Sequence, residues 1–274
     1  MSNDQLAAVF NAGIREFDRL TPQVWGPAGQ SLITQLRLRP GDAVLDVCSG
    51  AGASALPAAA AVGPTGLVHA VDVADDLLEM GRLVASDRAL HNVDFVRADA
   101  TEWEPPSTVP AAGYDALACS YGIFFLPDTD QSVNRLVRLL RPGGRIGVTV
   151  WRRGALTDFA RAYADVLARH LTGPAPSRTD ASPLSRFDTA AALTDWLTGF
   201  GAHSVEVTEL SNLLPATPQL AWDLILGGAM RAPLLGLDDD TVESIRRDFL
   251  SLLTERDVET LDATTLVGTA VVTG

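Results

Sequence analysis

The stretch from residue 43 to residue 52, AVLDVCSGAG, constrains the fold of this chain more than any other. Its apolar start predicts a short buried strand that ends at Asp46, and Gly50 and Gly52 open a loop before the alanine-rich run 53–61, which predicts a helix. Glycines let a backbone approach a ligand closely, and the start of the next helix offers unpaired N–H groups. We therefore expect a nucleoside-binding site at the end of this strand.

Short apolar runs alternate with helical runs beyond this loop. Strands are expected at 67–73, 93–99, 114–122 and 145–151, and helices at 75–89 and 129–140, with a turn at 141–144. This alternation predicts an α/β fold with a doubly wound, mostly parallel sheet. In such a sheet, ligands bind beyond the carboxyl ends of the strands, where the strand order reverses.

The flanking regions have helical patterns. Residues 5–20 predict one amphipathic helix that ends at Thr21-Pro22, and a second helix is expected from Gly29 to Leu38. After residue 151 we expect helices at 157–171 and 189–200, a strand at 203–210, a helical region at 215–260 and a β-run at 265–274. The Pro-, Ser- and Thr-rich segment 173–183 is interpreted as a lid or a plain connection.

Three parts are therefore expected along the chain. They are an N-terminal helical cap (1–39), a cofactor-binding core (40–151), and the remainder of the sheet with helical lid and substrate-binding insertions (152–274).

Composition excludes several functions. The net charge of −13 argues against binding to nucleic acid, which depends on clustered Lys and Arg. All 21 basic residues are Arg, so a Schiff-base lysine, a P-loop lysine and a lysine general base are ruled out. The only cysteines, Cys48 and Cys119, form no metal or disulfide pattern, and no apolar run is long enough to span a membrane. We expect a cytoplasmic protein with no metal site.

The glycine loop alone leaves the cofactor open, because G-A-G-A-S-A at 50–55 also fits the dinucleotide pattern GxGxxG/A. Asp46 favours another ligand, since an acid four residues before Gly50 suits a positively charged ammonium group and disfavours a pyrophosphate. A turn-capping role for Asp46 remains an alternative.

Three further strand ends carry polar groups. Asp72, at the end of the second strand, is placed to accept hydrogen bonds from both ribose hydroxyls. Asp99 and the backbone of Ala100 end the third strand and can read an adenine edge, whereas Ser120 and Tyr121 end the fourth. Helix capping by Asp72 and an ordinary loop position for Asp99 are the structural alternatives.

With these residues the chain resembles the class I S-adenosylmethionine-dependent methyltransferases, and among them the bacterial small-molecule enzymes that include the ubiquinone and menaquinone methylases. The resemblance is clear over about residues 40–151. The family loop D/E-x-G-x-G-x-G stands here as Asp46-Val-Cys48-Ser-Gly50-Ala-Gly52, with Cys48 in place of the first glycine. The loop is expected to form if Cys48 has ordinary backbone angles.

The resemblance implies a Rossmann-like seven-stranded sheet with N-terminal helices and a helical insertion before the last strand. Neighbouring first and fourth strands would bring Cys48 and Cys119 to the pocket floor. It implies that the methionine end of S-adenosylmethionine lies at the loop, the ribose at Asp72, the adenine at Asp99, and the methyl group at the fourth strand. The implied cofactor residues are Asp46, Cys48, Gly50, Gly52, Asp72, Val73, Asp99, Ala100, Ser120 and Tyr121.

Methyl transfer needs alignment of the reacting groups, and it needs a general base only for a hydroxyl, amine or carbon-acid acceptor. His170 and Tyr121 are the weak candidates for such a catalytic role. Large apolar side chains are expected to face a small aromatic, polyketide, prenyl or quinone-like acceptor, although core packing is the alternative for a helix stripe. They are Phe17, Trp25, Tyr121, Phe124, Phe125, Trp151, Trp222 and Met230.

The leading hypothesis is therefore a bacterial small-molecule methyltransferase of quinone or secondary metabolism. A protein that binds the same cofactor but catalyses cyclisation is the first alternative, and a nicotinamide-dependent oxidoreductase is the second. The acceptor atom (O, N or C), the natural substrate and the oligomeric state, a homodimer included, stay open.

Overall fold

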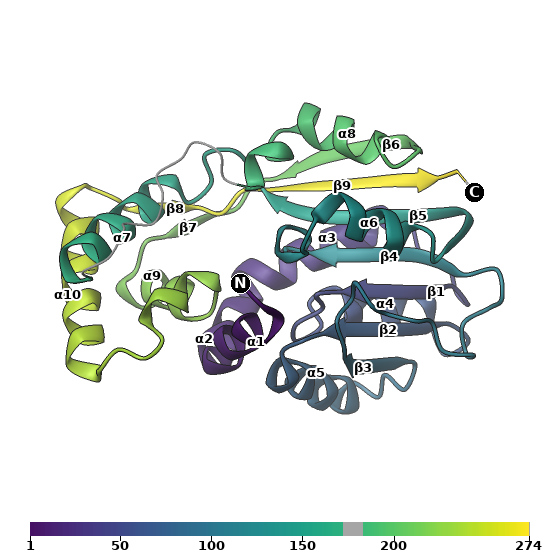
Figure 1. Ribbon diagram of the computed structural model, residues 1–274, viewed down its shortest axis with the longest axis horizontal. Helices are drawn as coiled ribbons and strands as arrows, with labels where there is room; N and C mark the ends of the chain where they lie inside the picture. Colours follow the sequence, from purple (N-terminus) through teal and green to yellow (C-terminus); the bar gives the residue numbers. More distant parts are fainter. Residues whose placement is uncertain (172–182, 274) are drawn as a thin grey trace.

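A computed structural model describes residues 1–171 and 183–273 of the chain. Its strands include β1 (Ala43–Val47), β2 (Leu67–Asp72), β3 (Val93–Arg97), β4 (Tyr114–Ser120), β5 (Leu140–Trp151), β6 (Ala202–Leu210) and β9 (Thr265–Val272). These seven form one sheet in the order β3-β2-β1-β4-β5-β9-β6 (Figure 1). The first five strands in this order, from β3 through β2, β1 and β4 to β5, pair in parallel. Strand β9 is antiparallel to both of its neighbours, β5 and β6. The expected seven-stranded, mostly parallel sheet is confirmed.

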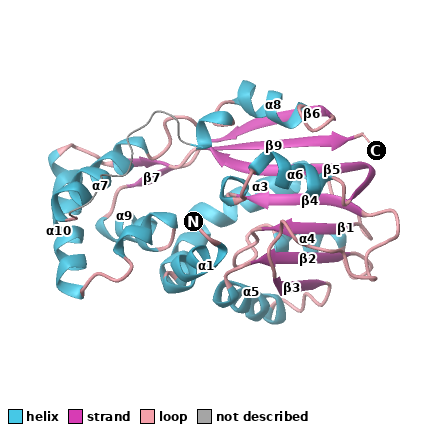
Figure 2. Ribbon diagram, in the orientation of Figure 1, coloured by secondary structure: helices cyan, strands magenta, loops and turns pink. Residues whose placement is uncertain are grey.

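Helices cover both faces of the sheet (Figure 2). They are α3 (Gly26–Leu36), α4 (Ala55–Val62) and α5 (Asp75–Asp87) on one face, and α6 (Thr129–Val137) and α8 (Ala190–Thr198) on the other. Two glycines of the sheet allow these helices to pack closely against it. A Cβ on Gly147 of β5 would lie 2.7 Å from Leu32 of α3, and one on Gly268 of β9 would lie 2.8 Å from Leu193 of α8. Gly268 pairs with Val148, the neighbour of Gly147, so the two glycines face opposite sides.

The N-terminal segment differs from the expected pair of helices. It folds into α1 (Asn3–Ala12), α2 (Ile14–Leu20) and a π-helical turn, Thr21–Trp25, that continues directly into α3. The break falls at Gly13, where a Cβ would lie only 2.2 Å from the carbonyl oxygen of Leu226. The α-helix ends at Leu20, as Thr21-Pro22 predicts, but the chain continues into the next helical segment because Pro22 occupies its first turn, where a missing N–H costs nothing.

The C-terminal part contains α7 (Thr157–His170), α9 (Pro218–Leu226), α10 (Asp239–Glu255) and the short strand pair β7 (Leu213–Pro215) and β8 (Thr260–Asp262). The expectation of a wholly helical region at 215–260 is wrong at both ends, since these residues lie in β7 and β8. Phe159 and Phe249 lie at the centre of the core that joins α7, α9 and α10 to Leu20 and Val24. Apart from Pro183, the segment 173–183 lies outside the described residues.

The turn expected at 141–144 lies within β5. Tyr114 pairs with Leu140 and Ala116 with Arg145, so four residues of β5 bulge opposite Asp115. Arg141 donates from Nε to the Asp115 carboxylate and ties the bulge to β4.

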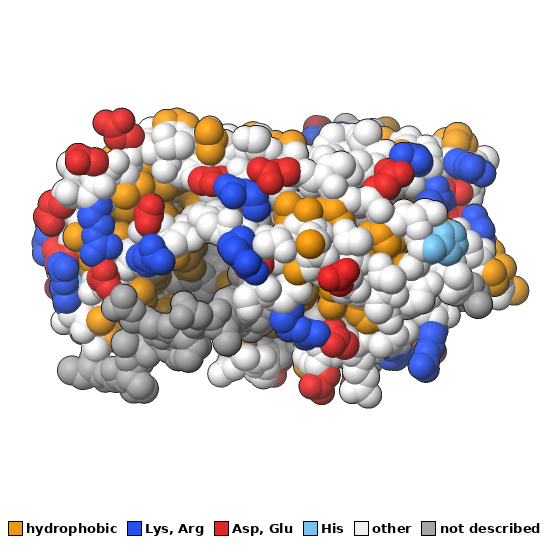
Figure 3. Space-filling model, turned by 90° about the horizontal axis from the view of Figure 1, so that it is seen from above, with side chains coloured by type: hydrophobic (Ala, Val, Ile, Leu, Met, Phe, Trp, Pro, Cys, Tyr) orange, Lys and Arg blue, Asp and Glu red, His pale blue; other side chains and the backbone are white. Residues whose placement is uncertain are grey.

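The carboxyl ends of β1, β2 and β4 point toward α1 and α2, and α7, α9 and α10 lie beyond (Figure 1). The fold thus places a helical cover over the edge where ligands bind in such sheets. The face seen in Figure 3 carries acidic and basic side chains interspersed. Within 1–171 and 183–273, no helix is long and apolar enough to cross a membrane.

Candidate functional site

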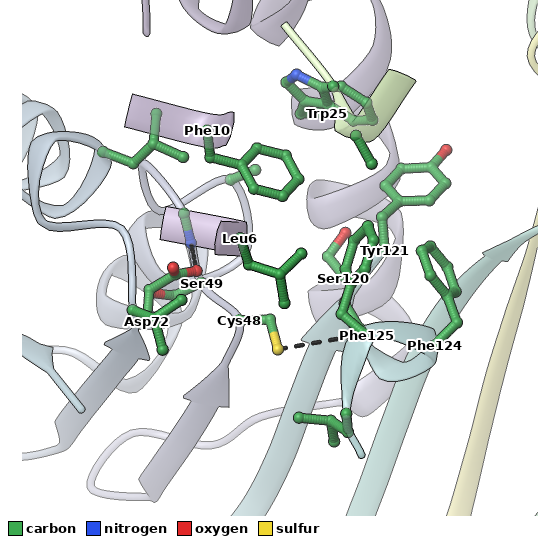
Figure 4. Close-up of a pocket in the computed structure, with 18 of the residues that line it drawn as sticks. Leu6, Phe10, Trp25, Cys48, Ser49, Asp72, Ser120, Tyr121, Phe124 and Phe125 are labelled. Atoms are coloured by element: carbon green, nitrogen blue, oxygen red, sulfur yellow. Dashed lines mark hydrogen bonds between the residues drawn. The ribbon is translucent and has the colours of Figure 1, made fainter. Parts of the chain in front are cut away.

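A cavity of about 500 Å³ lies at the carboxyl ends of β1, β2 and β4. Its floor is formed by the loop after β1, and its cover by Leu6 and Phe10 of α1 and Phe17 of α2 (Figure 4). Residues 228–230, after α9, close it from the side of the C-terminal helices. The cavity is therefore shared between the sheet, the N-terminal helices and the C-terminal part.

The loop after β1 has unusual backbone angles at Cys48, with φ 53°, and at Gly50, with φ 51°. This left-handed region favours glycine, which explains why a glycine stands at the Cys48 position in the resembling family. The expectation of ordinary angles at Cys48 is wrong, yet the loop forms. A Cβ on Gly50 would lie 3.2 Å from the Phe17 ring, so glycine leaves the backbone bare toward the cavity.

Gly52 does not line the cavity, contrary to the expectation that it contacts the cofactor. Its φ of 86° and the Phe95 ring, which would lie 2.9 Å from an added Cβ, account for glycine there. Gly52 serves the packing of the loop against β3.

Asp46 is also absent from the cavity wall. It is fully buried beneath the loop, where its carboxylate accepts a hydrogen bond from the Ser54 hydroxyl. The pKa of Asp46 is raised to about 7, mainly by burial and to a lesser extent by the nearby Asp72, while the hydrogen bond from Ser54 opposes the shift. Asp46 therefore does not reach the cavity as predicted, whereas Ser54, its hydrogen-bond donor, lines it.

Asp72 lies in the cavity wall beside Val73, as expected. Its Oδ2 accepts from the Gly50 N–H at 2.8 Å, and its Oδ1 accepts from the Ala74 N–H at 2.8 Å. Burial raises the pKa of this carboxyl, and the backbone donors counteract that shift. Asp72 therefore fixes the glycine loop and still presents lone pairs to the cavity.

Asp99 and Ala100 line the cavity at the end of β3. Oδ1 of Asp99 accepts from the backbone and hydroxyl of Thr101, and Oδ2 accepts from the Asn3 side chain at 2.6 Å. Burial alone raises the pKa of Asp99, but these hydrogen bonds and Arg135 hold it below the usual value. The acid is ionised and ready to accept.

Ser120 and Tyr121 continue the wall at the end of β4. The Ser120 hydroxyl lies 3.0 Å from that of Thr149, and the Tyr121 phenol hydrogen-bonds to the hydroxyl of Thr265. Burial raises the pKa of Tyr121, so the phenol stays protonated near neutral pH.

Aromatic rings form the other half of the wall (Figure 4). Phe17 and Trp25 stack with centroids 5.4 Å apart, and Tyr121 and Trp151 lie 4.3 Å apart. The predicted substrate-facing residues that line the cavity are Phe17, Trp25, Tyr121, Phe124, Phe125, Trp151 and Met230.

Two predicted residues lie elsewhere. Trp222 packs in the C-terminal core, with its ring centroid 6.4 Å from that of Phe249, because it faces inward on α9. His170 ends α7 and places Nε2 2.8 Å from a carboxylate oxygen of Asp248 on α10, so it ties two helices together and does not line the cavity. Neither residue supports the role expected of it.

Several lining residues were missed. Asn3, Leu6 and Phe10 share one face of α1, and helical spacing could have shown this. Ser49 and Ser54 flank the loop glycines, and the Ser49 hydroxyl is buried without a hydrogen-bond partner in the described chain. Such an unpaired hydroxyl fits a loop that awaits a ligand, although no sequence signal distinguishes it from an ordinary serine.

The two cysteines meet beneath the loop, as the strand order implies. Cys48 lies in the cavity wall, Cys119 is buried, and an added Cβ on Gly122 would lie 2.9 Å and 3.0 Å from their sulfur atoms. The hydrogen bond with Cys119, and then burial, raises the pKa of Cys48 well above its usual value, so its thiol is protonated. No cluster of three His, Cys, Asp or Glu side chains in the described ranges is placed to hold a metal ion.

The arrangement suits one ligand with a polar and an apolar end, or two ligands side by side. Carboxylates and bare backbone lie at the ends of β1 to β3, and aromatic rings begin at Tyr121. The order of these groups along the sheet matches the order implied for a methionine, ribose and adenine unit next to an acceptor.

Solved structures with this fold include a methyltransferase from Geobacter sulfurreducens in complex with S-adenosyl-L-homocysteine. It is 19% identical, covers 90% of this chain and 91% of its own, and has a TM-score of 0.56. The [4+2]-cyclase SpnF is similar too, with 19% identity, coverage of 89% and 80%, and a TM-score of 0.53. At these identities the likeness shows the fold alone, and the fold hosts both chemistries.

Sequence relatives are more specific. The chain is 34% identical to aklanonic acid methyltransferase DauC from Streptomyces sp. (strain C5), over 61% of this chain and 77% of that one. It is 34% identical to nocamycin O-methyltransferase from Saccharothrix syringae, over 53% of this chain but only 48% of the relative, so it spans about half of that protein. These matches favour methyl transfer over the cyclase and oxidoreductase alternatives.

A family model also matches residues 24–171, which is more than half of the chain. This range contains the β1 loop, Asp72, Asp99, Ser120 and Tyr121. The chain therefore belongs to the ubiE/COQ5 methyltransferase family, whose cofactor is S-adenosylmethionine.

Proposed function

We propose that this enzyme methylates a small, largely apolar aromatic molecule that binds in the cavity beside S-adenosylmethionine. One observation carries the proposal: the acid-lined and aromatic halves belong to one cavity and meet at Ser120 and Tyr121. An acceptor held by the rings would thus face the methyl group of a cofactor held by the acids.

The residues around the loop fit the cofactor. Gly50 leaves bare backbone toward the cavity, the Ser49 hydroxyl lacks a partner, and two carboxylates stand at the ends of β2 and β3. The cofactor supplies an activated methyl group on a positively charged sulfur. We assign its binding to Cys48, Ser49, Gly50, Ser54, Asp72, Val73, Asp99, Ala100, Ser120 and Tyr121, with Asp46 acting through Ser54.

The acceptor is inferred from the aromatic half. Stacked and edge-to-face rings favour flat, polarisable ligands over flexible aliphatic ones. The name of one relative states action on aklanonic acid and that of another on nocamycin, which supports a secondary metabolite here. We assign the acceptor surface to Phe17, Trp25, Phe124, Phe125, Trp151 and Met230.

Rate acceleration is assigned mainly to alignment of acceptor and methyl group. Tyr121, the catalytic candidate in the cavity, stays protonated at neutral pH and its phenol is engaged in a hydrogen bond with Thr265, so we assign it a placing role instead of base catalysis. O-, N- and C-acceptors are distinguished only by the product.

Calorimetry and a transfer assay test the proposal. We expect S-adenosylhomocysteine to bind with a micromolar-range dissociation constant, and radiolabelled methyl from the cofactor to appear on alizarin, a planar dihydroxyanthraquinone, but not on decanoic acid. Lack of cofactor binding, or labelling of decanoic acid alone, would refute it. Substrate turnover without label transfer would favour the cyclase alternative. Quenching of tryptophan fluorescence by NADH, with no effect of S-adenosylmethionine, would favour the oxidoreductase alternative.

We also propose that the enzyme acts in the bacterial cytoplasm, because the relatives named above are bacterial. Fractionation of the native host checks this, and recovery in the membrane or secreted fraction would contradict it. Gel filtration with light scattering distinguishes a monomer from a homodimer.

A further inference from the structure

Tyr121 is held by its backbone at the end of β4. Its φ is 55°, a left-handed conformation that is uncommon for an aromatic residue. The Tyr121 N–H donates to the carbonyl oxygen of Thr149 at 3.1 Å and also lies 3.0 Å from the Thr149 hydroxyl oxygen. These contacts with β5 aim the side chain across the next strands toward β9.

The hydrogen bond between Tyr121 and Thr265 has a defined direction. The Thr265 hydroxyl donates its own hydrogen to the carbonyl oxygen of Ala263 at 3.2 Å, so its oxygen accepts from the Tyr121 O–H. Thr265 is 1% exposed and does not line the cavity, whereas the Tyr121 ring does. The phenol is thus anchored behind the wall while the ring forms part of it.

Thr265 is linked to a second wall residue. It stands directly opposite Trp151 in the ladder between β5 and β9, and directly opposite residues share one face of a sheet. The Tyr121 and Trp151 rings lie 4.3 Å apart, and Trp25 contacts both, with centroid distances of 5.4 Å and 6.1 Å. A single buried threonine on β9 is therefore hydrogen-bonded to one ring of this aromatic trio and stands opposite a second.

We propose that Thr265 is a positioning residue that fixes the Tyr121 ring and thereby sets how the acceptor is placed before the transferable methyl group. The inference rests on the proposed function, because it concerns the acceptor half of the same cavity. The acids assigned to the cofactor end β2 and β3, on the far side of β1 and β4 from β9. Loss of the Thr265 hydroxyl should hence impair acceptor binding and turnover while cofactor affinity is retained.

Four variants test this. Thr265→Val keeps the shape but loses the hydroxyl, Thr265→Ser keeps a hydroxyl, Tyr121→Phe removes the phenol, and Thr269→Val is a matched control on the same face of β9. We expect T265V and Y121F each to weaken alizarin binding to the S-adenosylhomocysteine-loaded protein by about fivefold and to lower kcat by a similar factor, from the loss of one net hydrogen bond.

The double variant T265V/Y121F should be no worse than either single one, since both remove the same bond. T265S and T269V should behave like the parent, and the three threonine variants T265V, T265S and T269V should bind S-adenosylhomocysteine with unchanged affinity in calorimetry. Additive losses, or an equal loss of cofactor affinity, would overturn the positioning role.

A readout without acceptor separates this inference from the proposed function. Near-ultraviolet circular dichroism reports the packing of aromatic rings, those of Trp25, Tyr121 and Trp151 among them, and we expect its signal to fall in T265V but not in T269V. If parent enzyme fails to bind alizarin, the acceptor class is wrong, yet this spectrum still tests the anchor. An unchanged spectrum in T265V would refute it.

Discussion

Ser54 donates its hydroxyl hydrogen to Asp46, with Oγ 2.9 Å and 2.8 Å from the two carboxylate oxygens. The donor lines the cavity, and the acceptor lies wholly beneath it. An acid whose place before a glycine loop predicts contact with the ligand is thus separated from the cavity by a serine.

Asp46→Asn should change how stability depends on pH. Because burial raises the folded-state pKa to about 7 from the usual 3.8 of an aspartate, the folded state holds the proton more tightly, and the contribution of Asp46 to stability is lost as pH rises through that window. The parent should therefore lose roughly 2–3 kcal/mol relative to D46N between about pH 5 and about pH 8. Urea unfolding at both pH values measures this.

Asp87→Asn, at an exposed position on α5, is the matched control for D46N. Its free energy of unfolding should depend on pH as that of the parent does. Parallel stability curves for the parent and D46N would contradict the raised pKa.

Asp72→Asn should weaken cofactor binding. One carboxylate oxygen becomes an amide NH₂, which would confront the N–H of Gly50 or Ala74, so the loop loses a charge-assisted hydrogen bond. S-adenosylhomocysteine affinity should fall by roughly tenfold to a hundredfold in calorimetry. The exposed Asp75→Asn, three residues further on, should bind like the parent, and equal affinities for D72N and D75N would exclude the assigned role.

Gly122→Ala should destabilise the junction of β1 and β4. The new Cβ would lie 2.2 Å from the Cys48 Cβ, a clash that costs about 3 kcal/mol or more. The double variant G122A/C48G should recover part of this loss, because it removes the clashing atom and relieves the left-handed strain at position 48. Thermal unfolding compares the variants, and no recovery would place the strain elsewhere.

Arg19→Met should loosen the contact between α2 and α9. The guanidinium binds the carboxylate of Asp223 through Nε at 2.9 Å and through a terminal nitrogen at 2.6 Å, and Asp223 is buried. Removing one partner of such a pair costs roughly 3 kcal/mol, whereas R19M/D223N should cost less because no charge stays unpaired. Urea unfolding measures these losses. The control Arg246→Met, which breaks an exposed ion pair with Glu243, should change the free energy of unfolding little. A larger loss in R19M/D223N than in R19M would contradict this.

Sequence reasoning predicted the place of two of the three acids, Asp72 and Asp99, in the cavity wall. Asp72 and Asp99 follow strands whose apolar patterns are local, and parallel strands bring such ends to one edge of a sheet. The aromatic wall at Phe124 and Phe125 follows from the same rule, since these residues come just after β4.

The errors arose where distant parts of the chain decide local structure. The break at Gly13 depends on the carbonyl of Leu226, and the inward direction of Trp222 depends on packing against α10. Asp46 is buried because the glycine loop folds over it. The left-handed backbone angles of the loop at Cys48 and Gly50 determine that fold. None of these contacts leaves a periodic signal in sequence.

The position of β9 also bears on how the enzyme is made. Residues 265–272 follow every other strand along the chain, yet they lie between β5 and β6. During synthesis the acids of β1 to β3 are thus available well before Thr265 exists. The hydrogen bond that holds the Tyr121 ring is therefore completed only when this strand enters the sheet between β5 and β6.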